Sequence, residues 1–126
     1  MTKKVLKNQQ KEAREIVKQI FNLALAINSD CTKRKTTGEK PTVFVGFSGH
    51  IAGVHIEIYC KGWDSAEDDD SLVLRYLVYL GDEMFTTLVD EYEPYPEEQE
   101  SDQLTKAKAA LAELQKIAEE CGVDYV

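Results

Sequence analysis

Residues 54–61 alternate strictly between apolar and polar side chains, and this run restricts the fold more than any other part of the sequence. The apolar positions hold Val54, Ile56, Ile58 and Cys60, and the positions between them hold His55, Glu57, Tyr59 and Lys61. Because successive side chains of a strand point to opposite faces, the pattern predicts a half-buried strand. Its apolar face has to be covered by other elements of the chain.

Three further strands are predicted around this one, so that residues 42–91 form a four-stranded antiparallel meander. Residues 42–47 are β-branched and aromatic, and residues 84–91 follow a short turn. Residues 72–80 carry apolar side chains on both faces, which predicts a central strand. Short links between successive strands favour antiparallel pairing.

Two amphipathic segments with helical spacing flank the predicted sheet. They span residues 4–28 and 101–121, and Ser101 or Asp102 is a suitable N-cap for the second one. We expect both helices to cover one face of the sheet in an α+β two-layer sandwich with the order α-β-β-β-β-α. The length predicts a single domain over residues 1–126. The expected core consists of Ile16, Ile20, Leu23, Ile27, Val54, Ile56, Ile58, Leu74, Val78, Leu111, Leu114 and Ala118.

The cysteines and the apolar runs predict a cytoplasmic protein that is neither exported nor held in a membrane. No apolar run approaches the roughly 20 residues that a membrane span needs, and no signal-peptide pattern follows the basic start of the chain. The three cysteines are odd in number and far apart, which is not typical of a disulfide framework. We expect Cys60 and Cys121 to be small core residues and Cys31 to be an exposed thiol.

Motifs that resemble catalytic or metal sites fail on particular residues, so we expect no enzymatic activity, cofactor or metal. Residues 46–50 resemble the serine turn of hydrolases, but His50 stands where the second glycine is needed and a strand follows. The carboxylate-rich residues 64–70 resemble a calcium loop. Asp69 and Arg75, however, stand where that loop requires glycine and glutamate.

Charge is distributed unevenly along the chain. Residues 1–40 hold ten basic and four acidic residues, a net charge of +6, whereas the remaining 86 residues have a net charge of −14. Such asymmetry is a clue to partners rather than to the fold. A basic stripe is predicted on the face of the first helix opposite its apolar side. It consists of Lys3, Lys7, Lys11, Arg14 and Lys18.

Two acidic stretches form the candidate partner-binding surface. Residues 82–102 hold nine acidic residues and no basic one, and a second cluster lies within residues 64–70. The acidic candidates are Asp64, Glu67, Asp68, Asp69, Asp70, Asp90, Glu91, Glu93, Glu97, Glu98 and Glu100, and the candidate aromatic anchors are Trp63, Tyr92 and Tyr95. Because opposite charge speeds and selects association, we expect a basic or nucleic-acid-binding protein as partner, and no direct binding to duplex DNA or membranes.

The resulting hypothesis is a non-enzymatic protein-binding module. In size and charge the chain is similar to phage-encoded inhibitors of host defence nucleases, including anti-CRISPR proteins that imitate nucleic acid. That similarity implies an acidic inhibitor of a nuclease or another nucleic-acid-handling protein. One alternative is a self-assembling accessory or structural protein, in which the basic helix of one copy meets the acidic edge of another. A second alternative is a small ligand-binding domain or enzyme with an apolar pocket between sheet and helices. Both charge features also fit a solvated surface.

Overall fold

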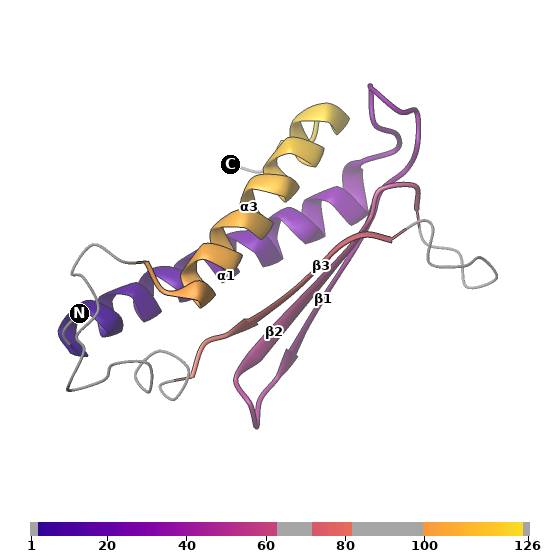
Figure 1. The fold of residues 1–126 in the computed structure, drawn as a ribbon. Coiled ribbons are helices and arrows are strands. Elements are labelled where there is room, and N and C mark those ends of the chain that lie inside the picture. The colour runs from indigo at the N-terminus through magenta and orange to yellow at the C-terminus, as the bar shows by residue number, and fades with distance from the viewer. Residues whose placement is uncertain (1–2, 63–71, 82–99, 125–126) are drawn as a thin grey trace.

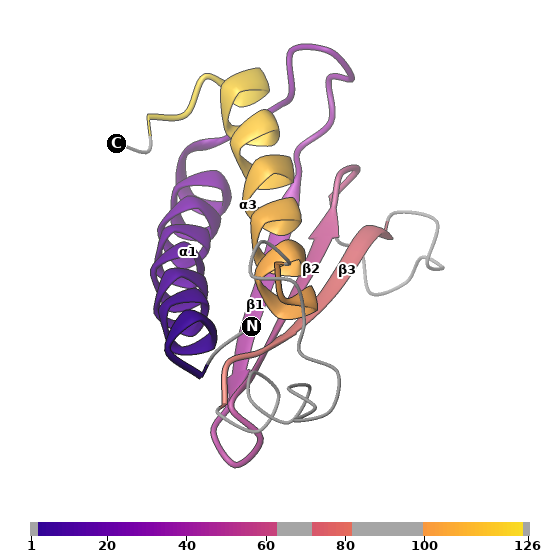
Figure 2. The same ribbon diagram turned by 60° about the vertical axis from the view of Figure 1, so that its left-hand side comes forward.

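The fold is a two-layer arrangement in which two helices cover one face of an antiparallel sheet (Figures 1 and 2). The computed structural model describes residues 3–62, 72–81 and 100–124. Its elements, in chain order, are α1 (Lys3–Asp30), β1 (Thr42–Ser48), β2 (Gly53–Tyr59), β3 (Leu72–Tyr79) and α3 (Asp102–Cys121). The predicted α+β class and the terminal helices are therefore present.

The prediction of a four-stranded sheet was wrong. The described sheet has three strands in the order β1-β2-β3, and β2 pairs antiparallel with both neighbours. The predicted fourth strand, residues 84–91, lies outside the described residues. Within the described sheet, β3 is an edge strand rather than a central one. The second apolar face of β3 belongs to the outer face of the sheet, which points away from the helices. Leu77 is exposed there.

The apolar face of the sheet packs against both helices. Val43, Val54, Ile56 and Val78 are almost fully buried there, and the register places them side by side on one face. All twelve predicted core residues belong to the core or pack against it, with Leu74 and Leu111 partly buried and the other ten buried. The alternation in β2 and the helical spacing were therefore sufficient to predict which faces are buried.

The two helices run side by side in the same direction (Figure 2). Near their starts, the backbone N–H of Ser101 donates a hydrogen bond of 2.7 Å to Oε1 of Gln9. At their other ends, Cys31, which directly follows α1, and Cys121, the last residue of α3, form a disulfide with a Cα–Cα distance of 5.4 Å. Both ends of the helix pair are therefore tied together.

Three amide side chains from the helices bind backbone groups of the sheet. Asn28 accepts from the N–H of Val43 at 2.8 Å and donates to its carbonyl at 2.7 Å, as a neighbouring strand would. At the other end of the sheet, buried Gln10 donates to the carbonyl of Leu80 at 2.7 Å. Gln103 of α3 accepts from the N–H of Tyr79 at 2.9 Å. These bonds fix the position of each helix relative to the strands.

The prediction that none of the three cysteines forms a disulfide was wrong for Cys31 and Cys121. Cys31 is 2% exposed rather than open to solvent, and it is bonded to Cys121. Cys60 is free and buried, which confirms its predicted place in the core. The pairing was missed because 90 residues separate the two partners in sequence. Only the parallel course of the helices brings them together.

Loss of the disulfide should destabilise the protein strongly. Replacing Cys31 and Cys121 with serine is expected to lower the free energy of unfolding by about 2–5 kcal/mol, because the bond restricts the unfolded chain over a long loop. Urea unfolding with and without reductant measures this difference. A thiol titration in denaturant without reductant should find one reactive thiol per chain, that of Cys60. Three reactive thiols would contradict the bond.

Candidate functional site

Most of the predicted partner-binding residues lie outside the described residues. They belong to residues 63–71 and 82–99, which we call the acidic segments. The described residues, 3–62, 72–81 and 100–124, are called the framework. The acidic segments contain all the predicted aromatic anchors, Trp63, Tyr92 and Tyr95, and the acidic candidates Asp64, Glu67, Asp68, Asp69, Asp70, Asp90, Glu91, Glu93, Glu97 and Glu98.

Glu100 belongs to the framework, and it takes part in contacts within the chain. Its carboxylate lies 3.2 Å from Nζ of Lys108, which also lies 3.8 Å from the carboxylate of Glu12. This cluster ties the start of α3 to α1. Glu100 therefore has a structural role, whatever its contribution to binding a partner.

The two acidic segments are attached to opposite ends of β3. The first begins after Gly62, which has a left-handed φ of 86° and follows β2. The second begins after Gly81, close to the end of β3, and returns to the framework at Glu100 (Figure 1). The eight residues of β3 span about 26 Å at the usual rise of a strand. The attachment points of the two segments on β3 therefore lie far apart.

The framework itself is net basic. The acidic segments contain twelve acidic residues and no basic one. All fifteen basic residues of the chain and eleven acidic ones belong to the framework, which gives it a formal charge of +4. The net charge of −8 for the whole chain thus conceals a basic framework that carries two acidic segments.

The predicted basic stripe lies on an exposed face of α1. Lys7, Lys11, Arg14 and Lys18 are all exposed, while the side chain of Lys3 lies outside the description. Lys18 is paired with Glu15 at 2.9 Å. The stripe therefore exists as a surface feature of the framework.

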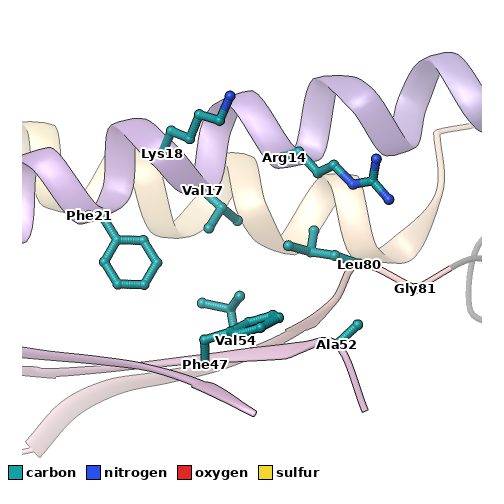
Figure 3. A pocket seen from close by; sticks show the side chains of 9 residues that line it. All are labelled: Arg14, Val17, Lys18, Phe21, Phe47, Ala52, Val54, Leu80 and Gly81. Carbon is teal, nitrogen blue, oxygen red and sulfur yellow. The ribbon is translucent and has the colours of Figure 1, made fainter. Parts of the chain in front are cut away.

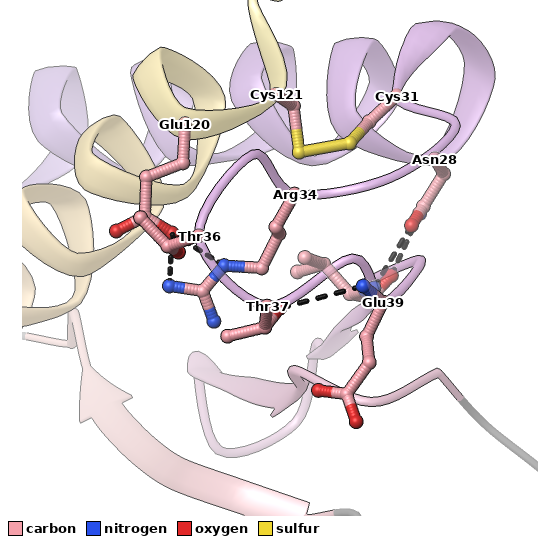
Figure 4. Close-up of a disulfide and its surroundings, with 9 residues drawn as sticks. Asn28, Cys31, Arg34, Thr36, Thr37, Glu39, Glu120 and Cys121 are labelled. Carbon is pink, nitrogen blue, oxygen red and sulfur yellow. Dashed lines mark hydrogen bonds and ion pairs between the residues drawn. A yellow bond between two sulfur atoms is a disulfide. The ribbon is translucent and has the colours of Figure 1, made fainter.

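Arg34, in the loop between α1 and β1, does not add to this basic surface. It is 8% exposed and forms an ion pair with Glu120 near the end of α3 (Figure 4). Glu120 also accepts a hydrogen bond from the hydroxyl of Thr36 at 3.2 Å, and its carbonyl accepts from the N–H of Lys35 at 3.0 Å. These contacts dock the loop between α1 and β1 onto α3.

Arg34 also influences the free thiol. Burial raises the pKa of the Cys60 thiol, and the neighbouring guanidinium of Arg34 counteracts this only in part. Because the thiolate is the reactive form of cysteine, the raised pKa keeps Cys60 in its unreactive, protonated form at neutral pH. The position favours a structural role for this cysteine over a nucleophilic one.

A groove of about 380 Å³ opens between α1 and one end of the sheet (Figure 3). Its walls are mainly apolar, and two of its phenylalanines are partly open to solvent, Phe21 at 36% and Phe47 at 58%. Arg14 reaches toward the side of the groove where Leu80 and Gly81 lie, whereas the ammonium group of Lys18 points away from the sheet. The lining residues are Arg14, Val17, Lys18, Phe21, Phe47, Ala52, Val54, Leu80 and Gly81.

Sequence reasoning missed this groove as a specific site. It anticipated an apolar pocket between sheet and helices only as a consequence of a ligand-binding function. Phe47 shares a face with the buried residues Val43 and Val54. It was not among the expected core residues, and it is 58% exposed. The groove exists because α1 does not cover the end of β1. The periodicity of the sequence shows which face of a strand is apolar, but not how far a helix extends over it.

The opposite face of the sheet carries a mixed polar and aromatic surface. The ring of Tyr59 meets that of Phe44 edge to face at 5.6 Å, and its hydroxyl donates to Glu57 at 3.0 Å. Arg75 lies 3.5 Å from the same glutamate. The imidazole of His55 covers Gly46 and fills the space that a Cβ atom at this position would occupy. These side chains therefore contact one another on the outer face of the sheet.

The described residues form neither a metal-binding cluster nor a membrane-spanning helix. The histidine, cysteine and acidic side chains of the framework do not form a group of three or more that could hold a metal ion. Neither of the described helices combines the length and apolar character needed to cross a membrane.

Comparison with known proteins found no match among protein-family models, curated proteins or solved structures.

The ion pair between Arg34 and Glu120 provides a test of how the loop is held. Replacing Arg34 with methionine should lower the free energy of unfolding by about 3 kcal/mol, because the carboxylate of Glu120 is left without its buried partner. Adding Glu120→Leu should recover most of the loss. Urea unfolding of both variants measures the effect.

An exposed ion pair serves as the control for this test. Arg75→Met removes the partner of Glu57 on the outer face of the sheet, where the arginine side chain is 61% exposed. The expected loss there is about 1 kcal/mol or less. Equal losses at Arg34 and Arg75, or a double variant no more stable than Arg34→Met, would contradict the structural role of the buried pair.

Proposed function

We propose that the protein is a non-enzymatic binding module that holds a basic protein partner through its two acidic segments. The observation that carries this proposal is the separation of charge, with twelve acidic residues in the segments and a framework of formal charge +4. A basic surface would be attracted to the segments and repelled by the framework. Such complementarity speeds association and sets the orientation of the partner.

The ion pairs of the framework support different roles for the charges of the framework and those of the acidic segments. Lys18, Arg34, Arg75 and Lys108 all pair with acidic residues of the framework itself. The framework therefore supplies its own counter-charges for these four cations. The proposed role of the acidic segments is to supply charge to another molecule.

A nucleic-acid-binding protein is the partner class that fits this charge layout best. The groove or channel that such a protein uses for phosphates is basic, and a dense row of carboxylates has the same sign as the phosphate backbone. Occupation of that groove would make the chain an inhibitor. Direct binding to duplex DNA does not follow, because the segments would repel it.

A cytoplasmic location completes the proposal, since partners of this class are found there. Disulfides persist mainly in oxidising compartments, however. In a reducing cytoplasm Cys31 and Cys121 would be thiols, and the helix ends would be held by the remaining contacts of Arg34 with Glu120. Rapid alkylation of thiols in intact cells would show which state is present, and a fully oxidised pair would contradict the cytoplasmic location.

Neutralising the acidic segments tests the function. One variant carries Asp68→Asn, Asp69→Asn and Asp70→Asn, and a second carries Glu97→Gln and Glu98→Gln. In a pull-down from lysate at low salt, each variant should retain about a tenth or less of a basic partner captured by the native chain, since close charge pairs contribute more than 1.4 kcal/mol. Capture should also fall as salt is raised.

A matched variant keeps this test specific. Asp30→Asn with Glu119→Gln removes two exposed carboxylates from the framework instead of the segments. It should capture the partner as well as the native chain does. Unchanged capture by both segment variants, or an equal loss in the framework variant, would overturn the proposal.

A further inference from the structure

We propose that the groove between α1 and the sheet is a binding site for an amphipathic carboxylate, that is, one apolar chain with a carboxylate at one end. Every lining residue that the structure describes belongs to the framework. Binding at this site is therefore a second activity that does not rest on the proposed capture of a basic protein.

The apolar part of the site comes from both layers of the fold. Val17 and Phe21 project from α1, and Phe47, Val54 and Leu80 form the opposite wall (Figure 3). The volume of about 380 Å³ lies within the size range of small-molecule sites, roughly 300–1,000 Å³. A chain placed between these walls would cover the exposed parts of Phe21 and Phe47, and burial of apolar surface favours binding.

The polar part of the site is Arg14. Its guanidinium extends along the groove toward Leu80 and Gly81, and the described lining contains no acidic residue. The planar fork of an arginine matches a carboxylate through two parallel hydrogen bonds. Lys11 precedes Arg14 on the same exposed stripe of α1 and adds charge of the same sign. The head group is therefore expected to be an anion rather than a cation.

The shape of the groove favours a single free molecule over a membrane surface. Phe21 and Phe47 lie on opposite walls, one on the helix and one on the strand. Side chains that insert into a bilayer form a protruding apolar face, as on an interfacial amphipathic helix. A groove bounded on two sides encloses one chain instead.

A titration of the full-length protein with two probes tests the site. Decanoate and decyltrimethylammonium have the same chain and opposite head charges, and both are used below their micelle-forming concentrations. Decanoate should shift the NMR amide signals of residues 14–21 and 47–54 saturably. It should bind about tenfold more tightly than the cation, as expected for one charge-assisted contact.

Two variants separate the head and tail contributions. Arg14→Gln should weaken decanoate about tenfold and leave the cation unchanged or tighter. Phe47→Ala should weaken both probes, and its side chain is exposed enough for the fold to tolerate the change. The matched controls are Leu77→Ala on the outer face of the sheet and Lys106→Gln on an exposed face of α3. Both controls should bind decanoate as the native chain does.

Several results would overturn this inference. They are the absence of saturable shifts, equal affinity for the two probes, and unchanged decanoate binding in Arg14→Gln. Binding to phosphatidylglycerol vesicles without binding to free decanoate would also exclude it, in favour of a membrane surface. The pull-down variants should bind decanoate normally, and Arg14→Gln should still capture the basic partner, so the two proposals fail independently.

Discussion

The two hydrogen bonds between the side chain of Asn28 and the backbone of Val43 determine how α1 lies on the sheet. An amide side chain here takes the place of a neighbouring strand at the edge of β1. Buried Gln10 makes the corresponding bond at the far end of the sheet, to Leu80. With both points fixed, α1 crosses the sheet at a set angle, and the groove beside Phe47 follows from this placement.

The sequence predicted the buried faces of the fold but not its long-range pairings. Strict alternation in β2 and helical spacing in α1 and α3 identified the core, since burial repeats with the period of each element. The bond between Cys31 and Cys121 was not predicted, because it depends on two helices ending at the same place. The central position assigned to β3 was wrong because an apolar outer face has the same pattern as a strand buried on both sides.

In the candidate sites, too, features that depend on one element could be predicted, whereas contacts between distant parts of the sequence could not. The exposed basic stripe on α1 was predictable, since it depends only on helical spacing. The buried pairing of Arg34 was not, because Glu120 lies 86 residues away. The charge of the framework was also hidden, since a total of −8 does not show that every basic residue lies outside the acidic segments.

The disulfide has a consequence for what happens when the backbone is cut. Cys31 precedes the whole sheet and Cys121 is the last residue of α3, so the bond closes a covalent ring that contains both acidic segments. A protease that cleaves once within either segment would open this ring without releasing a fragment. The two pieces would separate only after reduction, so a nicked protein would run as a single species on a non-reducing gel.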